Sequence, residues 1–133
     1  MDKYKVVIVD DDEVALKKLS IELRKNPYFS LDGTARNGKQ GEKLITKIQP
    51  DLLFLDVEMP DMTGLDLLHD LHDNISWGMR VVFYTAYEKY MIHAIRESVF
   101  DYLLKSFEGQ ELKNILTRFM AQMETEPKKV LPI

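Results

Sequence analysis

The chain of 133 residues is 45% hydrophobic and 30% charged, which is typical of one soluble globular domain. It has no cysteine and no apolar run of the roughly 18 residues that cross a bilayer, so disulfides, thiolate metal sites and a membrane span are excluded. A net charge of −4 argues against a nucleic-acid-binding face, and an N-terminus without the features of a signal peptide predicts a cytoplasmic protein.

Two apolar periodicities alternate along the chain. Short runs of β-branched and aromatic residues are typical of buried parallel strands, and apolar residues three or four positions apart are typical of amphipathic helices. The expected strands are residues 5–9, 30–36, 52–55, 81–84 and 102–104. After each strand a helix is expected, whose apolar residues are in turn Ala15, Leu16, Leu19 and Leu23; Leu44, Ile45 and Ile48; Leu67, Leu68 and Leu71; Met91, Ala94 and Ile95; and Leu112, Ile115, Leu116, Phe119, Met120 and Met123.

Five repeats of strand and helix predict a fold of the α/β class. Right-handed crossovers join parallel strands and place helices on both faces, which makes a doubly wound five-stranded parallel sheet. We expect this domain to span residues 1–123. Residues 124–133 contain two prolines and several charges but no periodicity, so they predict the start of a linker to an output domain that is absent from this chain.

Polar residues follow four of the expected strands at the point where each strand ends. They are Asp10 and Asp11, Asp56, Thr85, and Lys105. In an open parallel sheet, ligands bind outside the carboxyl ends of the strands, so these side chains are expected to converge on one edge. A charged group at the end of a buried strand needs a partner, which an apolar core does not offer. The set therefore predicts a functional site.

The chemistry of these residues is that of a phosphoacceptor. Three neighbouring carboxylates repel one another, and Mg²⁺ or Mn²⁺ relieves this repulsion through the oxygen ligands that such ions prefer. A carboxylate beside the ion can act as a nucleophile toward a phosphoryl group. Lys105, as a flexible point charge, and Thr85, as a hydroxyl donor, would stabilise the phosphoryl oxygens. No nucleotide cofactor is expected, because the chain has no Gly-rich phosphate loop.

Over roughly residues 4–123 the sequence resembles the receiver domains of two-component response regulators. The matching segments are Val9-Asp10-Asp11-Asp12, the run from Leu55 to Gly64, Thr85-Ala86, and the run from Asp101 to Lys105. The resemblance implies a flavodoxin-like, CheY-like sheet with the strand order 2-1-3-4-5. It also implies that helices one and five cover one face and that helices two, three and four cover the other.

The resemblance implies a role for each acidic residue. Asp56 matches the residue that is phosphorylated by a phosphohistidine of a sensor histidine kinase. Asp11 and the main-chain carbonyl of Glu58 match the ligands that hold the metal ion together with Asp56, and Asp10 matches a further acid of the same pocket. The protein implied is a switch rather than an enzyme, limited to self-phosphorylation from small donors and autodephosphorylation.

Three further residues match the switch that responds to phosphorylation. Thr85 and Lys105 match the residues that contact the phosphoryl group, and Tyr102 matches an aromatic residue that turns inward on activation. The family has a proline after its lysine, whereas Ser106 follows Lys105 here. Because cis peptide bonds are rare before residues other than proline, we expect a trans Lys105–Ser106 bond.

Residues 84–90 and 100–105 further resemble receivers that are joined to LytTR-type DNA-binding domains, and residues 129–133 resemble the lead-in to such a domain. This resemblance implies transcription regulation, with DNA contacted only through the absent output domain. It also implies a homodimer through helix four, strand five and helix five. The alternative within the family is a stand-alone receiver that relays its signal by protein–protein contact.

Two other classes of protein fit this sequence less well. An aspartyl-phosphate hydrolase of the haloacid dehalogenase type has an Asp two residues after its nucleophile, where this chain has Glu58. A flavodoxin-like FMN carrier holds a phosphate in its first loop. Here that loop is the acidic run of residues 10–13, which would repel an anion.

Overall fold

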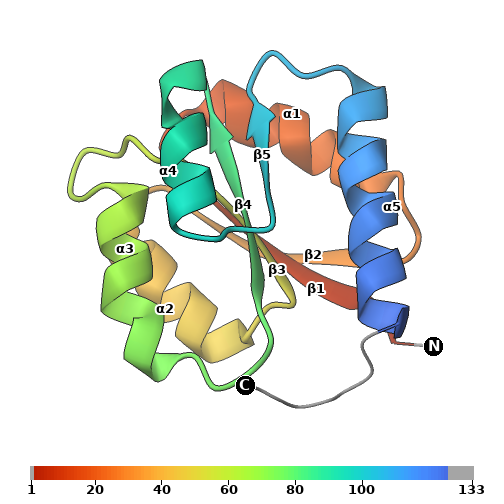
Figure 1. Cartoon of the computed structure of the whole chain (residues 1–133), viewed down its shortest axis with the longest axis horizontal. Coiled ribbons are helices and arrows are strands. Elements are labelled where there is room, and N and C mark those ends of the chain that lie inside the picture. The colour runs from red at the N-terminus through yellow and green to blue at the C-terminus, as the bar shows by residue number, and fades with distance from the viewer. Residues whose placement is uncertain (1, 126–133) are drawn as a thin grey trace.

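The computed structural model describes residues 2–125, which contain the strands β1 (Tyr4–Val9), β2 (Phe29–Ala35), β3 (Leu52–Leu55), β4 (Arg80–Thr85) and β5 (Asp101–Leu104). These strands are parallel and form a sheet in the order β2-β1-β3-β4-β5 (Figure 1). The predicted fold class and strand order are therefore confirmed. β3 lies inside the sheet and all four of its residues are buried, because helices cover both of its faces, and its sequence is accordingly apolar throughout.

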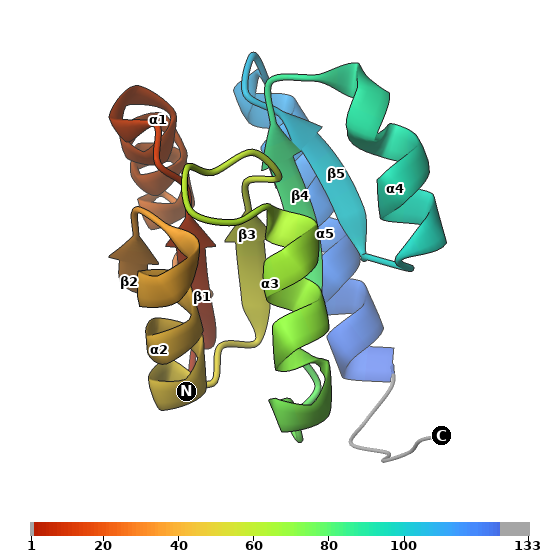
Figure 2. The same cartoon turned by 90° about the vertical axis from the view of Figure 1, so that its left-hand side faces the viewer.

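Helices cover both faces of the sheet (Figures 1 and 2). They are α1 (Glu13–Arg24), α2 (Gly38–Ile48), α3 (Gly64–Leu71), α4 (Met91–Arg96) and α5 (Gly109–Thr125), with the short 3-10 helices η1 (His72–Asn74) and η2 (Glu88–Tyr90). Successive side chains of a strand point to opposite faces. In β1, Val6 and Ile8 pack with α1 and α5, whereas Val7 and Val9 pack with α2, α3 and α4. The predicted distribution of the helices over the two faces is therefore confirmed.

Two aspartates fix the loops at the carboxyl end of the sheet. Asp12 is the N-cap of α1, and its side chain accepts hydrogen bonds from two backbone N–H groups of the first turn. Asp61, in the β3–α3 loop, accepts hydrogen bonds from the N–H groups of Gly38 and Lys39 at the start of α2. The bond from Gly38 contributes most to holding the pKa of Asp61 below its usual value. These caps hold in place the loops that flank Asp10 and the end of β3.

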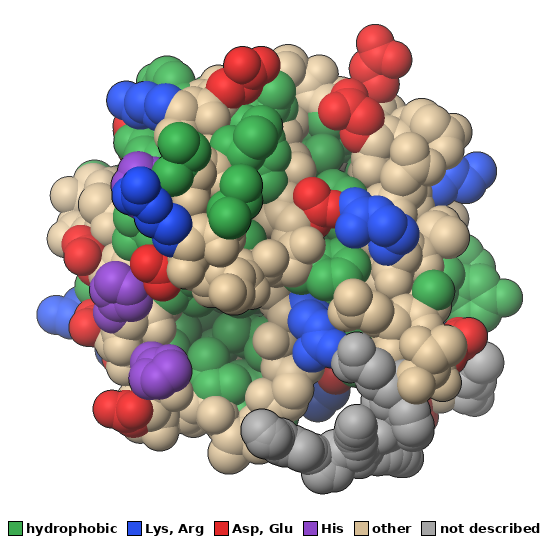
Figure 3. Space-filling model, in the orientation of Figure 1, with side chains coloured by type: hydrophobic (Ala, Val, Ile, Leu, Met, Phe, Trp, Pro, Cys, Tyr) green, Lys and Arg blue, Asp and Glu red, His purple; other side chains and the backbone are tan. Residues whose placement is uncertain are grey.

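Helix α4 differs from the expected helix. Its apolar spacing predicts a packed face, and Ala94 is buried, but Met91, Ile92 and Ile95 are 46%, 55% and 72% exposed. The helix has only six residues, less than two turns, so it offers little length to pack against the sheet. We call Met91, Ile92 and Ile95 the α4 patch, and Figure 3 shows hydrophobic side chains gathered over this helix.

Helix α5 continues to Thr125, past the expected end of the domain at residue 123. Residues 126–133 of the expected linker lie outside the described residues. None of the helices within residues 2–125 is long and apolar enough to cross a membrane.

Candidate functional site

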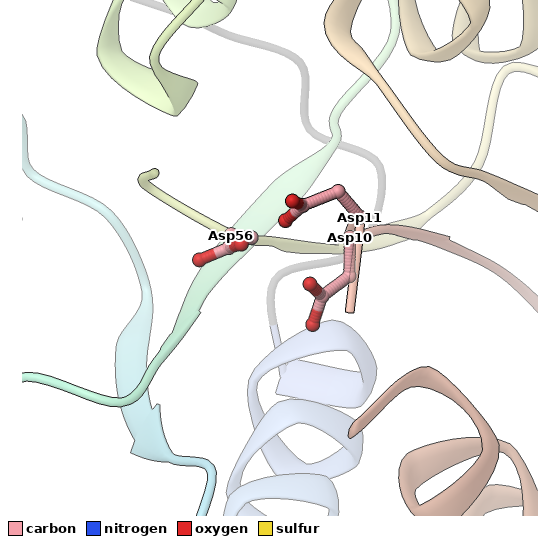
Figure 4. A group of neighbouring side chains, drawn as sticks. All are labelled: Asp10, Asp11 and Asp56. Carbon is pink, nitrogen blue, oxygen red and sulfur yellow. The ribbon is translucent and has the colours of Figure 1, made fainter. Parts of the chain in front are cut away.

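Three carboxylates meet at the carboxyl end of the sheet (Figure 4). Asp10 follows β1, Asp11 is the next residue, and Asp56 follows β3. One oxygen of each carboxylate lies within 4.8 Å of the others. The backbone pairing continues beyond the strands, since the N–H of Asp10 donates to the carbonyl of Ala35 and the N–H of Asp56 donates to that of Val9, both at 2.9 Å. The sheet itself therefore fixes the backbones from which the carboxylates project.

The environment of these carboxylates fits a divalent cation. Asp10 is fully buried and Asp56 is 3% exposed, whereas Asp11 is exposed. The Oδ2 atom of Asp10 is buried and has no hydrogen-bond partner within residues 2–125. An unpaired, buried carboxylate oxygen is costly, and a cation beside it removes that cost. Because all the donors are oxygens, the residues suit Mg²⁺.

Lys105, directly after β5, brings a positive charge to the cluster. Its Nζ lies 2.9 Å from Asp10 Oδ1 and 3.4 Å from Asp56 Oδ2, and its side chain is 15% exposed. Burial acts to lower the pKa of Lys105, but the hydrogen bond to Asp10 and the nearby negative charges outweigh it, so the pKa lies above its usual value. The described chain contains no cis peptide bond, so the Lys105–Ser106 bond is trans, as predicted.

The surroundings of the Asp56 carboxyl strongly raise its pKa. Burial raises the pKa of Asp56 to about 8, helped by the charge of Asp10 and opposed by Lys105. A protonated carboxyl is a poor nucleophile, so the site needs further positive charge to keep Asp56 ionised at neutral pH. A divalent cation would supply that charge. Both the raised pKa of Asp56 and the set of carboxylate oxygens therefore favour a divalent cation at this site.

Thr85 ends β4, the strand that lies between β3 and β5. Its side chain is fully buried, and its carbonyl accepts a hydrogen bond from the N–H of Lys105 at 2.8 Å. Its Oγ1 accepts a hydrogen bond from the N–H of Tyr87 at 3.2 Å, which leaves the hydroxyl proton to be donated. Thr85 is thus placed between the strands that carry Asp56 and Lys105.

The loop that follows Asp56 folds back closely on it. The N–H of Glu58 donates to Asp56 Oδ1 at 3.3 Å, and the N–H of Gly64 donates to the carbonyl of Val57 at 2.7 Å. A Cβ added at Gly64 would overlap the carbonyl oxygen of Asp56, so this close approach requires glycine. The fold of the loop therefore sets the backbone of Glu58 beside the carboxylate of Asp56.

Two contacts of the Glu58 side chain could not be predicted from the sequence. The Tyr90 hydroxyl donates to Glu58 Oε2, and Lys89 Nζ lies 3.8 Å from the same oxygen. The hydrogen bond to Glu58 raises the pKa of Tyr90 to about 12. Tyr90 is 32 residues away from Glu58 along the chain, and no local pattern signals the contact. The side chain of Glu58 is thus engaged by η2, while its backbone N–H contacts Asp56.

Tyr102 lies on β5 and packs, half-buried, against the apolar core beneath α2, α3 and α4. Its hydroxyl is buried, and none of the described residues bonds to it. Desolvation raises the pKa of Tyr102 above its usual value. The ring of the candidate switch residue therefore points inward in this structure.

Known proteins are similar to this chain in sequence over most of its length. Residues 6–117 match the family model described as response regulator receiver domain. The chain is 34% identical over 128 residues to the transcriptional regulatory protein BtsR of Escherichia coli (strain K12), an alignment that covers 96% of this chain and 53% of that protein. The chain thus spans about half the length of the curated relatives it matches.

Solved structures share the fold. The response regulatory domain of protein mrkE from Klebsiella pneumoniae has a TM-score of 0.81 at 25% identity, with 91% of this chain and 98% of that chain covered. The REC domain of AraT from Geobacillus stearothermophilus also has a TM-score of 0.81, at 26% identity, with 92% and 97% covered. Since the family model spans residues 6–117, this chain belongs to the response regulator receiver domains of two-component systems.

Proposed function

We propose that this domain is a phosphoacceptor switch in which Asp56 takes a phosphoryl group from a phosphohistidine of a sensor histidine kinase. The observation that carries the proposal is the meeting of three carboxylates within 4.8 Å, with Lys105 Nζ against two of them. A purely structural ion pair would need one acid for Lys105, whereas two contact it here and a third lies beside them. Membership of the receiver family supports the same reading.

In the proposed reaction a carboxylate oxygen of Asp56 attacks the phosphorus atom. A new O–P bond forms as the P–N bond of the phosphohistidine breaks, and the imidazole leaves with the bonding electron pair. Lys105 and Thr85 then donate hydrogen bonds to the phosphoryl oxygens, for which Lys105 exchanges a carboxylate partner for the new anion. Water later hydrolyses the acyl phosphate on Asp56. The domain would therefore hydrolyse only the phosphoryl group that it carries itself.

The residues that would hold Mg²⁺ are Asp11, Asp56 and the main-chain carbonyl of Glu58, with Asp10 beside them. The ion would neutralise the carboxylates and the incoming phosphoryl oxygens. Mn²⁺ has the same ligand preference and would substitute for it. The exposed position of Asp11 leaves the metal side of the cluster open to solvent, where a small donor or a kinase would approach.

The proposed switch acts through Thr85 and Lys105, because both must turn toward the phosphoryl group and the loops after β4 and β5 move with them. Tyr102 lies on β5 beside these loops. The adjacent α4 patch exposes apolar surface of the kind that marks interaction sites. We propose that phosphorylation shifts the domain toward a homodimer formed through α4, β5 and α5, and a preference of ~1.4 kcal/mol gives a tenfold shift.

The proposed output is transcription regulation in the cytoplasm. BtsR, which is named a transcriptional regulatory protein, is about twice as long as the segment that this chain matches. The resemblance of residues 84–90 and 100–105 to receivers joined to LytTR-type domains indicates a DNA-binding output domain of that type. DNA would be contacted through the output domain, because this chain carries a net charge of −4.

A structure of the protein with Mg²⁺ and beryllofluoride, an acyl-phosphate mimic, tests the proposal. We expect the mimic on Asp56, with the ion against Asp11 and the Glu58 carbonyl and with Lys105 and Thr85 turned to the fluorides. A mimic bound elsewhere would overturn the site. Light scattering on the same sample tests the dimer, and an unchanged mass with Asp56 occupied would overturn the dimer alone.

A further inference from the structure

Residues 104–107 form a turn that carries Lys105, and a lysine of α1 binds this turn. Within the turn, the N–H of Phe107 donates to the carbonyl of Leu104 at 2.9 Å. The carbonyls of Lys105 and Phe107 take no part in that bond, and each instead accepts a hydrogen bond from Lys18 Nζ at 2.8 Å. The same ammonium lies over the ring of Phe107, 4.2 Å from its centroid. One side chain therefore holds the backbone of the turn at two carbonyls, on either side of Ser106.

Helix α1 provides a rigid base for this contact. Leu19, the residue after Lys18, is fully buried in the core between α1, α5 and the sheet. The Tyr84 hydroxyl, which comes from β4, donates to the carbonyl of Ala15 in α1 at 2.8 Å. The ring of Tyr84 also packs against that of Phe107, with centroids 6.0 Å apart. The turn thus contacts both α1, through Lys18, and β4, through Tyr84.

The held turn determines where the Lys105 ammonium lies. Lys105 is the second residue of the turn, and its Nζ reaches two carboxylates at 2.9 and 3.4 Å. Ser106, the third residue, is exposed and has no ring to fix its backbone angle φ, as a proline there would have. The two carbonyl contacts of Lys18 supply the restraint that the local sequence lacks.

We propose that Lys18 is a positioning residue for phosphorylation of Asp56: by binding the carbonyls of Lys105 and Phe107, it holds the turn that aims the Lys105 ammonium at the phosphoryl site. This inference rests on the proposed function, because it assigns Lys18 a part in that reaction. Lys18 itself touches neither Asp56 nor the phosphoryl group and acts through Lys105.

The matched pair of variants is Lys18→Met and Lys17→Met. Both keep an unbranched chain and remove one positive charge from α1, but Lys17 is exposed and lies on the solvent side of the helix. Native-state amide exchange is independent of phosphorylation. We expect the Phe107 amide to exchange about tenfold faster in Lys18→Met than in the wild type or in Lys17→Met, with the β1 amides unchanged. Equal exchange of Phe107 in all three proteins would overturn the proposal.

A double-mutant cycle with Lys105→Met then separates positioning from a general effect on the fold. With acetyl phosphate and Mg²⁺, we expect Lys18→Met to slow modification of Asp56 about tenfold, as a misplaced catalytic group does, and Lys17→Met to leave it unchanged. In the Lys105→Met background, Lys18→Met should have no further effect.

The same tenfold loss in the Lys105→Met background would overturn the proposal, and so would an unchanged rate in Lys18→Met. A wild type that acquires no phosphoryl group would instead overturn the proposed function. The exchange measurement would still decide whether Lys18 holds the turn.

Discussion

Replacing Asp56 by Asn tests the electrostatics of the acidic cluster. Without metal, burial raises the pKa of Asp56 to about 8 in the folded protein, and Asp10 adds to the shift. In the unfolded chain an Asp carboxyl titrates near its ordinary value of ~3.9. Between these values the folded state holds a proton that the unfolded state has lost, so stability falls as pH rises from about 4 to about 8. Asn does not ionise, so Asp56→Asn escapes this loss.

The raised pKa sets the size of the expected effect. One pKa unit corresponds to ~1.4 kcal/mol. Relative to low pH, ionisation of Asp56 therefore costs the wild type roughly 1–2 kcal/mol at pH 5 and roughly 4 kcal/mol at pH 7. The stability advantage of Asp56→Asn over the wild type should therefore grow by roughly 2–3 kcal/mol between these two pH values.

Urea unfolding in the presence of EDTA at pH 5, 6 and 7 measures this difference. Asp70→Asn, at an exposed position of α3, is a matched control that should follow the wild type at each pH. Mg²⁺ at 100 times its Kd should stabilise the wild type at pH 7 by about 2.7 kcal/mol and the Asp56→Asn variant by less. A difference between wild type and Asp56→Asn that stays constant or shrinks as pH rises would refute the reasoning.

Three further substitutions test the loop, the switch residue and the α4 patch. Gly64→Ala should lower the free energy of unfolding in urea by about 2–4 kcal/mol, because its Cβ would overlap the backbone oxygen of Asp56. Gly78→Ala, whose Cβ would meet no neighbour, should lower it far less, and equal losses in the two variants would contradict this reasoning. Tyr102→Phe removes a buried hydroxyl that lacks a partner among the described residues, so stability should stay the same or rise by about 1 kcal/mol, and a clear loss would show that the hydroxyl is bonded. Ile95→Glu should abolish beryllofluoride-dependent association in light scattering without preventing modification of Asp56, and association at the wild-type level would argue against this face.

The parts of the fold that were predictable are those in which local pattern and tertiary environment agree. β3 reads as a central strand because burial on both faces demands an unbroken apolar run, and its Leu-Leu-Phe-Leu sequence leaves little choice. The convergence of Asp10, Asp56 and Lys105 was predictable for a related reason. Each directly follows a strand, and the carboxyl ends of parallel strands share one edge of the sheet.

The contacts that the sequence does not reveal join side chains to distant partners. Lys18 bonds to carbonyls 87 and 89 residues away, and on its own helix it reads as one more surface lysine. The apolar periodicity of α4 does not predict the exposure of Ile95, and the reason is different. Spacing shows that a helix has an apolar side, but not whether the folded chain supplies anything to cover it.

The intact mass of the protein after incubation with acetyl phosphate tests the central claim most directly. The wild type should gain the mass of one phosphoryl group when Mg²⁺ or Mn²⁺ is present, and it should gain none after chelation or when Asp56 is replaced by Asn. An equal gain in Asp56→Asn, or a gain that survives chelation, would contradict the assignment of Asp56 as a metal-dependent phosphoacceptor.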